Sequence, residues 1–153
     1  MVENTKDSLY YLLSQVIRLH YHQVHGHLEK IGIYPGQPPV LFQLAEKNGL
    51  SQKEMAENMK IKPATLTVML NRMESGQLVE RRQDPDDQRV SRVYITDLGR
   101  DRASELKEIF KTLEEECFQN VTPDEQAFLR RMFMQMRDNL TEANKKLGDV
   151  TLC

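Results

Sequence analysis

A predicted helix over residues 63–75 carries small and polar side chains on the face opposite its apolar residues. Such a face lets a helix approach the edges of DNA bases, and Asn71 can pair bidentately with adenine. Threonine hydroxyls can bond to phosphates or bases, and small apolar groups can touch a thymine methyl. The contacts predicted from this helix and the residue before it are Lys62, Pro63, Ala64, Thr65, Thr67, Val68, Asn71 and Arg72. An ordinary solvated helix is the alternative for this segment alone.

Arg89 lies in an Asp/Pro-rich tip between two predicted strands, at about residues 78–82 and 90–95. Asp87, two residues earlier, can orient the arginine. A tip of this length can carry a guanidinium into the minor groove of DNA, where negative potential favours a cation. The arginines expected near phosphates are then Arg81, Arg82 and Arg92. A solvated hairpin tip is the alternative interpretation.

Two short helices and this hairpin would position these groups. Ser51 and Glu54 have the spacing of a capping box, so a helix is predicted to begin at Gln52. Pro63 suits the first position of the next helix, because its missing amide would have no partner there. The order of helix, turn, helix and two strands is that of a winged helix-turn-helix, which places one helix in a DNA groove.

Long amphipathic helices are predicted on both sides of this lobe, over residues 8–30, 97–120 and 123–147. A short helix over residues 39–47 is predicted before the capping box, and the proline-rich segment 33–39 is predicted to be non-helical. The small lobe does not need three long helices to be compact. Their apolar stripes could therefore bury one another or a second copy of the chain.

The composition is that of one globular domain, residues 1–153, with 39% hydrophobic and 29% charged residues. No apolar run approaches the roughly 18 residues of a membrane span, and the N-terminus has no signal-peptide pattern. Cys117 and Cys153 lie far apart, which favours a reducing cytoplasm over a disulfide framework. Cys117 falls on an apolar stripe and is predicted to be a buried core residue.

Charge placement says more than the formal net charge of −2, which does not suggest nucleic acid. Seven basic and five acidic residues lie between Lys60 and Arg92, so the candidate DNA-binding lobe is modestly basic and the flanking helices carry most of the acid. The chain has no glycine-rich phosphate loop, nucleophile motif or convincing carboxylate pair. We therefore expect neither an enzyme nor a cofactor.

The sequence resembles the MarR (multiple-antibiotic-resistance regulator) family of bacterial transcription factors. The resemblance rests on the residue runs 66–74 (LTVMLNRME), 78–81 (LVER), 84–89 (DPDDQR) and 93–99 (VYITDLG), together with the order of all six helices. Two positions depart from the family pattern. Lys62 stands where a serine-like helix cap is usual, and Gln77 stands where glycine is usual, with Gly76 one residue earlier.

The resemblance implies a mainly α fold with a small β wing, a winged helix-turn-helix flanked by N- and C-terminal dimerisation helices. It assigns residues 39–96 to the DNA-binding lobe, and residues 1–34 and 97–153 to the dimerisation helices. It also implies a homodimer, with two winged lobes spaced to bind a pseudo-palindromic operator in double-stranded DNA. An effector cleft is expected between the dimerisation helices and each lobe.

Aromatic and imidazole side chains of the first helix are candidates for that cleft. Tyr10, Tyr11, His20, Tyr21 and His27 would suit an aromatic or phenolic effector, although the same residues could simply be packed.

Two further histidines, His22 and His25, lie in the same helix, on the face opposite His20 and His27 at about 100° per residue. His20 and His27 are expected to line the dimer core or the cleft, and His22 and His25 to be solvated. The four cannot ligate one ion while the helix is intact, so no metal is assigned. His22 and His25 could chelate with help from another element.

These observations favour a cytoplasmic, ligand-responsive, homodimeric repressor. A ligand that stabilises a lobe spacing incompatible with the operator would release DNA. A zinc-responsive regulator of the same fold and a winged helix that binds proteins without DNA are the alternatives.

Overall fold

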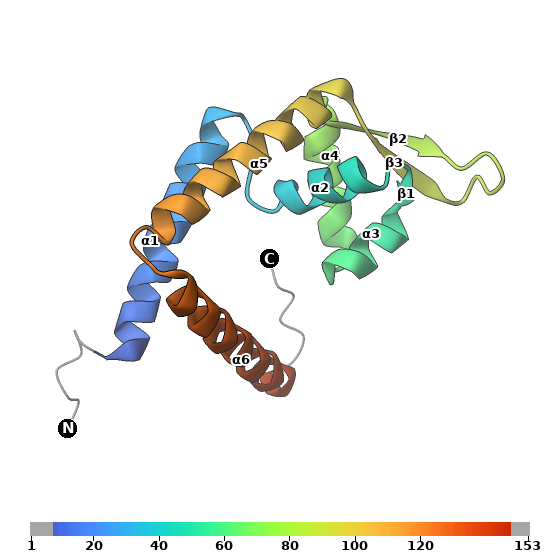
Figure 1. Ribbon diagram of the computed structural model, residues 1–153. Coiled ribbons are helices and arrows are strands. Elements are labelled where there is room, and N and C mark those ends of the chain that lie inside the picture. Colours follow the sequence, from blue (N-terminus) through green and yellow to red (C-terminus); the bar gives the residue numbers. More distant parts are fainter. Residues whose placement is uncertain (1–7, 148–153) are drawn as a thin grey trace.

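A computed structural model describes residues 8–147 of the chain (Figure 1). Its helices are α1 (Leu9–Lys30), α2 (Gln37–Glu46), α3 (Gln52–Met59), α4 (Pro63–Ser75), α5 (Asp97–Cys117) and α6 (Pro123–Leu147). Its strands are β1 (Leu50–Ser51), β2 (Val79–Gln83) and β3 (Ser91–Ile95), which form an antiparallel sheet in the order β1-β3-β2. The predicted fold class, mainly α with a small β wing, is confirmed. Cys153 and the outer ends of the predicted dimerisation segments lie outside the described residues.

The winged lobe holds most of the hydrophobic core. Helices α2, α3 and α4 pack with the sheet and with the first half of α5, while the β2–β3 hairpin projects from the lobe (Figure 1). The fully buried side chains include Leu41, Leu44, Met55, Leu66, Leu70, Met73, Val93 and Leu106. Three of these come from α4, so the apolar face of that helix fixes the direction of its opposite face.

The predicted helix caps explain where α3, α5 and α6 begin. Ser51 and Glu54 form a complete capping box, and the Thr96 hydroxyl accepts from the Gly99 amide at 3.0 Å. Thr122 and Glu125 exchange the equivalent bonds at the start of α6. Lys62 makes no side-chain cap at the start of α4, where Pro63 occupies the first turn instead.

The prediction for α2 missed the start of the helix, because residues 37–38 were predicted to be non-helical. The helix begins at Gln37 rather than Pro39, and it ends at Glu46. Pro38 is accommodated because the first amides of a helix have no intrahelical acceptor, so a proline there removes no hydrogen bond. The strand β1 was not predicted at all, because two residues are too few to show an alternating pattern. Leu50 nevertheless pairs with Val93 across the sheet.

Gln77 adopts a left-handed conformation, with φ of 58°, in the turn that joins α4 to the wing. The Leu78 amide donates to the Met73 carbonyl and the Gln77 amide to the Glu74 carbonyl, which is the hydrogen bonding of a Schellman motif. Glycine is the usual residue at that position. Gly76, one residue earlier, has a φ of −82° and is therefore not the left-handed residue of this turn.

Helices α1 and α6 lie outside the winged lobe (Figure 1), and most of their residues are exposed. No residue of α6 is buried, and Leu28 is the single buried residue of α1 among those described. Cys117, predicted to be buried, is exposed, because the C-terminal end of α5 runs beyond the core. Within residues 8–147, every helix is too short or too polar to cross a membrane.

Candidate DNA-binding interface and effector cleft

The predicted contact face of α4 is exposed throughout. Leu66, Leu70 and Met73 hold the helix against the core, and Val68 on the opposite side is 53% exposed. The other exposed members of this face are Lys62, Pro63, Ala64, Thr65, Thr67, Asn71 and Arg72. The Thr67 hydroxyl donates to the Pro63 carbonyl at 3.0 Å and accepts from Gln52 Nε2 at 3.5 Å. The structure therefore brings the α4 residues together on one accessible surface.

Arg81, also predicted near phosphate, is hydrogen-bonded to two residues of α4. Its guanidinium Nε donates to Glu74 Oε2 at 2.9 Å, and its Nη2 donates to Glu74 and, at 2.6 Å, to Asn71 Oδ1. The Arg81 backbone amide also donates to Glu74 Oε1 at 2.9 Å. The side-chain hydrogen bond from Arg81 holds the pKa of Glu74 below its usual value. These bonds join α4 to β2.

The tip of the wing has the predicted Asp–Arg arrangement. Arg89 Nε and Nη2 donate to the two carboxylate oxygens of Asp87 at 3.0 and 3.1 Å, and the Arg89 side chain is 91% exposed. The bond from Arg89 lowers the pKa of Asp87 and raises the pKa of Arg89. Arg89 is thus a permanently charged group, oriented by a carboxylate, at the outermost part of the hairpin.

Arg92, predicted near phosphate, is hydrogen-bonded within the lobe. Its Nε donates to Asp84, and its Nη1 donates to the Gly49 carbonyl at 3.0 Å. Asp84 is 8% exposed and also accepts the amides of Asp86 and Asp87 at 2.8 and 3.1 Å. The Asp84 interaction was missed, although an aspartate followed by proline at a hairpin tip is a recognisable turn signal.

Arg82 is exposed on the wing, with its guanidinium 4.6 Å from the centre of the Tyr94 ring and paired with Glu80. Of the four wing arginines, Arg82 and Arg89 are therefore the ones with a largely accessible guanidinium, since Arg81 and Arg92 are half-buried.

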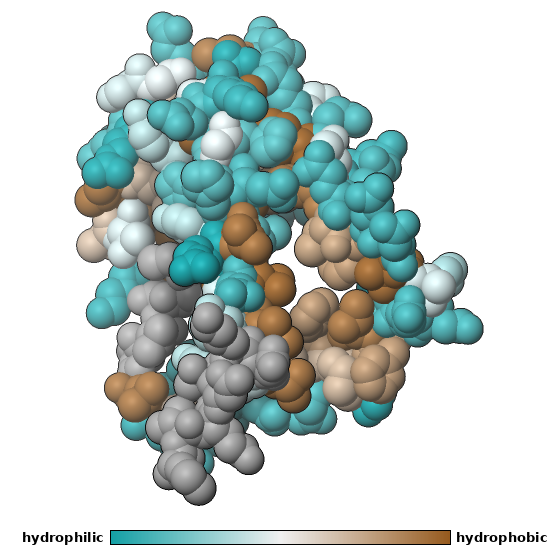
Figure 2. Space-filling view, turned by 90° about the vertical axis from the view of Figure 1, so that its left-hand side faces the viewer, coloured by the Kyte–Doolittle hydropathy of each residue, from teal (hydrophilic) through white to brown (hydrophobic). Residues whose placement is uncertain are grey.

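A cavity of about 870 Å³ lies between α1, α2 and α5, next to the winged lobe. Two predicted cleft residues, His20 and Tyr21, line it, whereas Tyr10, Tyr11 and His27 do not. Apolar side chains predominate in the rest of the lining, among them Val24, Phe42 and Phe110. The face seen in Figure 2 shows hydrophobic side chains gathered around a hollow.

His25 was predicted to be solvated, and this was wrong. It is half-buried beside the same cavity, with its ring centre 4.4 Å from that of Tyr21. Its Nε2 is buried and has no hydrogen-bond partner within residues 8–147. The spacing of four residues after Tyr21 and three before Leu28 could have placed it on the inward stripe.

The described part of the chain has no group of three or more metal-ligating side chains close enough to hold an ion. His22 is exposed and His25 turns inward, so the structure does not bring this pair together as a chelate.

Residues 33–91 match the family model of the MarR family. The chain is 30% identical over 109 residues to the uncharacterised HTH-type transcriptional regulator YdgJ of Bacillus subtilis, covering 71% of this chain and 66% of YdgJ. It is 38% identical over 72 residues to the B. subtilis repressor MdtR, covering 47% of this chain and 46% of MdtR. The chain thus spans about half to two thirds of these two relatives. The B. subtilis regulator YwoH is 30% identical over 130 residues, covering 83% of this chain and 94% of YwoH.

Solved structures of the same fold include two with DNA. One is the S. aureus MepR–DNA complex, with a TM-score of 0.75 and 20% identity over 86% of this chain and 98% of MepR. Another is the repressor CouR bound to a 23-mer duplex, with a TM-score of 0.75 and 22% identity over 90% of this chain and 97% of CouR. The curated relatives are transcriptional regulators, which confirms the prediction that the chain is not an enzyme. The chain belongs to the MarR family of transcriptional regulators.

Proposed function

We propose that this chain is a ligand-responsive, homodimeric repressor that reads a pseudo-palindromic operator with α4 and the wing. The observation that carries the DNA-reading part is the pairing of an exposed polar face on α4 with an extended, carboxylate-oriented Arg89. A helix of this character fits the major groove, and Arg89 suits the adjacent minor groove. The MepR and CouR complexes, which share the fold, support this role. Such a protein would act in the cytoplasm.

The uncovered helices support a homodimer. Apolar side chains along α1 and α6 face solvent in the single chain, which is unusual for helices of this length unless another surface covers them. The most exposed of these include Leu9, Ile17, Leu19, Phe128, Leu140 and Leu147. Residues 8–34 and 97–147 would then form the described part of the dimerisation segments, and residues 39–96 would form the DNA-binding lobe.

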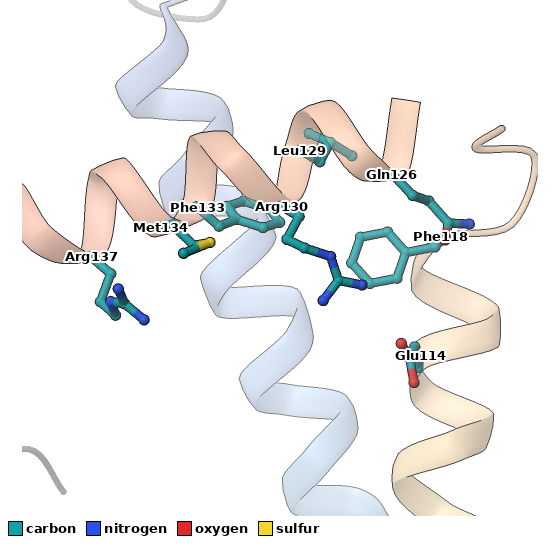
Figure 3. Close-up of a pocket in the computed structure, with 8 residues that line it drawn as sticks. All are labelled: Glu114, Phe118, Gln126, Leu129, Arg130, Phe133, Met134 and Arg137. Carbon is teal, nitrogen blue, oxygen red and sulfur yellow. The ribbon is translucent and has the colours of Figure 1, made fainter. Parts of the chain in front are cut away.

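A groove between α5 and α6 belongs to the same uncovered region (Figure 3). It has a volume of about 450 Å³. Phe118 and Glu114 face it from the end of α5, and Arg130, Phe133 and Met134 face it from α6. A partner helix in this groove would bury its apolar side chains and would pack beside Arg130, whose side chain points toward Phe118 (Figure 3).

The large cavity beside α1 supports the ligand-responsive part. Its lining is mostly apolar and includes His25, whose buried Nε2 has no hydrogen-bond partner within residues 8–147, so it suits an aromatic effector with a hydroxyl or carboxyl group that reaches the imidazole. Pro35 lines this cavity and also a smaller one against α4. A methyl group at Gly36 would lie 3.0 Å from Met69 Cε of α4. An effector that moves the segment around Pro35 would therefore displace α4.

Selection from a library of duplexes with a random core tests the DNA-reading proposal. The full chain is expected to enrich an inverted repeat from the library. If no sequence is enriched, even at low salt, the winged lobe does not bind DNA with sequence specificity. The alternative, a winged helix that binds proteins, would then gain support.

Thermal-shift titration with a panel of phenols and aromatic carboxylates tests the effector site. A binder should raise the melting temperature of the wild type and of the exposed-site control His22→Phe, and should release the enriched duplex. The shift should disappear in His25→Phe. Equal shifts in all three proteins would place the effector elsewhere, and a zinc-induced rise lost in His22→Ala would favour the metal-responsive alternative.

A further inference from the structure

The side-chain amide of Asn71 is held in one orientation by the wing. Arg81 Nη2 lies 2.6 Å from one of the two terminal atoms of Asn71. A guanidinium nitrogen only donates hydrogen bonds, so the atom that faces it must be the carbonyl oxygen Oδ1. The amide orientation at Asn71 is therefore determined by its partner.

Arg81 is itself immobilised. Its side chain makes two hydrogen bonds to Glu74, and Glu74 also accepts the Arg81 backbone amide. The Arg81 and Glu74 side chains are 24% and 31% exposed, so the pair is partly shielded from water. A clamp with this number of charge-assisted bonds is geometrically specific and costly to break. Asn71 is thus held by a fixed group and not by a mobile surface arginine.

The terminal atom of Asn71 that makes no hydrogen bond within residues 8–147 is Nδ2, which carries two donors. Asn71 is exposed, on the same face of α4 as Thr67 and Val68. Bidentate pairing of asparagine with adenine needs Oδ1 to accept from the adenine N6 amino group, and here Arg81 uses one of the two lone pairs of Oδ1 and holds that oxygen on the side of the wing. Guanine presents two acceptors in the major groove, N7 and O6, whereas adenine presents one acceptor and one donor. A group that offers donors fits guanine and opposes the N6 amino group of adenine.

We propose that Arg81, clamped by Glu74, makes Asn71 a donor group that selects guanine and not adenine. Asn71 is the specificity-determining residue, and Arg81 is a positioning residue that acts through it. This inference rests on the proposed DNA-binding function, and it reverses the base expected from the type of residue alone.

The test compares base preferences selected from a random-core duplex library by the wild type, Asn71→Ala and Arg81→Met. The position read by Asn71 is the one at which Asn71→Ala loses its preference while flanking positions keep theirs. There the wild type should favour guanine over adenine by about tenfold. Arg81→Met frees Oδ1, so it should shift that position toward adenine and leave the flanking preferences unchanged, which a merely structural role of Arg81 would not do.

Adenine at that position in the wild type, or unchanged guanine in Arg81→Met, would overturn the inference while leaving the proposed function intact. If the wild type enriches no sequence, the inference and the proposed DNA-binding function are both contradicted. Should Arg81→Met fail to fold in a melting experiment, Asn71→Asp replaces it as the test. An aspartate has no N–H donor, so guanine preference must vanish there, and its retention would overturn the inference.

Discussion

At the residue scale, three carboxylates hold most of the positive charge of the wing in place. Glu74 binds Arg81, Asp84 binds Arg92, and Asp87 binds Arg89, and in each pair the side-chain hydrogen bond from the arginine is the largest cause of a lowered carboxyl pKa. The first two pairs are partly buried and join elements of the lobe. The third is exposed and orients its guanidinium outward, so Arg89 and Arg82 carry the accessible positive charge of the wing.

Asp84 makes the stability of the wing depend on pH. Because Arg92 and two backbone amides lower its pKa in the folded state, its contribution is fully present above the unfolded pKa of about 3.9 and is lost as pH falls through the folded pKa. We expect Asp84→Asn to be less stable than the wild type in urea unfolding at pH 7. The stability difference should shrink as pH falls below about 4. A difference that grows on acidification would contradict the assigned ion pair.

Residue types in the sequence were enough to predict the exposed face of α4 and the Asp87–Arg89 pair, because both depend on local spacing. They did not show that Arg81 and Arg92 are engaged within the protein. Arg81 is bonded to Glu74, on the preceding helix, and Arg92 is bonded to Asp84 and to the Gly49 carbonyl, 43 residues away in the chain. Such pairings depend on how elements pack, which the type of residue does not reveal.

At the element scale, the junction between the wing and α5 is packed without free space. The Thr96 hydroxyl caps α5 and donates its one hydrogen to the Gln77 carbonyl at 2.6 Å, with the Leu78 carbonyl as a second acceptor at 3.1 Å. A methyl group at Gly99, in the first turn of α5, would lie 2.1 Å from the Leu78 carbonyl oxygen and 2.7 Å from Ile95 Cγ1. This glycine allows α5 to cross directly over the end of the hairpin, and so fixes the wing relative to the long helix.

Gly99→Ala should therefore destabilise the protein by about 2 kcal/mol or more, because backbone must move to relieve the overlap. The matched control is Gly26→Ala in α1, where a methyl group meets nothing within 4 Å. That change should be neutral or stabilising by about 0.5–1 kcal/mol, since alanine favours a helix interior over glycine. Urea unfolding of both variants gives the comparison, and equal effects would argue against the close approach of α5 to the wing.

Helix starts were predictable where a local signal specifies them, as at Ser51, Thr96 and Thr122. Elements that depend on tertiary context were not. The first turn of α2 tolerates prolines because its amides have no intrahelical acceptors, and β1 exists because Leu50 lies beside Val93 in the folded lobe. The inward position of His25, by contrast, follows from its spacing to Tyr21 and Leu28, which line the same cavity.

At the scale of the whole molecule, hydrophobic side chains are more buried in the winged lobe than on the long helices α1 and α6. The winged lobe buries its apolar residues, whereas α1 and α6 leave large ones in solvent, such as Leu9 at 87% exposed and Leu140 at 58%. The apolar stripes predicted on these helices are present, but they stay largely exposed within residues 8–147. A second copy that covers them would also set the distance between two DNA-binding lobes.

A charge placed on the α6 stripe should weaken the proposed dimer. We expect Leu140→Glu to raise the dissociation constant measured by sedimentation equilibrium at least tenfold, since it places a charge in an apolar interface. The matched control, Asn139→Glu, adds the same charge at the neighbouring exposed residue, which hydrogen-bonds to Gln135. It should leave the dimer nearly unchanged. A wild type that is monomeric at micromolar concentration would contradict the assignment of these helices.

The central claim is that this regulator binds DNA through α4 and the wing, and the salt dependence of binding tests it most directly. Affinity for the enriched duplex would be measured against salt concentration for the wild type, Arg89→Ala and the control Lys107→Ala, which removes an exposed cation from α5. Arg89→Ala should bind more weakly, with a salt slope shallower by about one. Lys107→Ala should match the wild type. Unchanged affinity and slope in Arg89→Ala at low salt would contradict the claim.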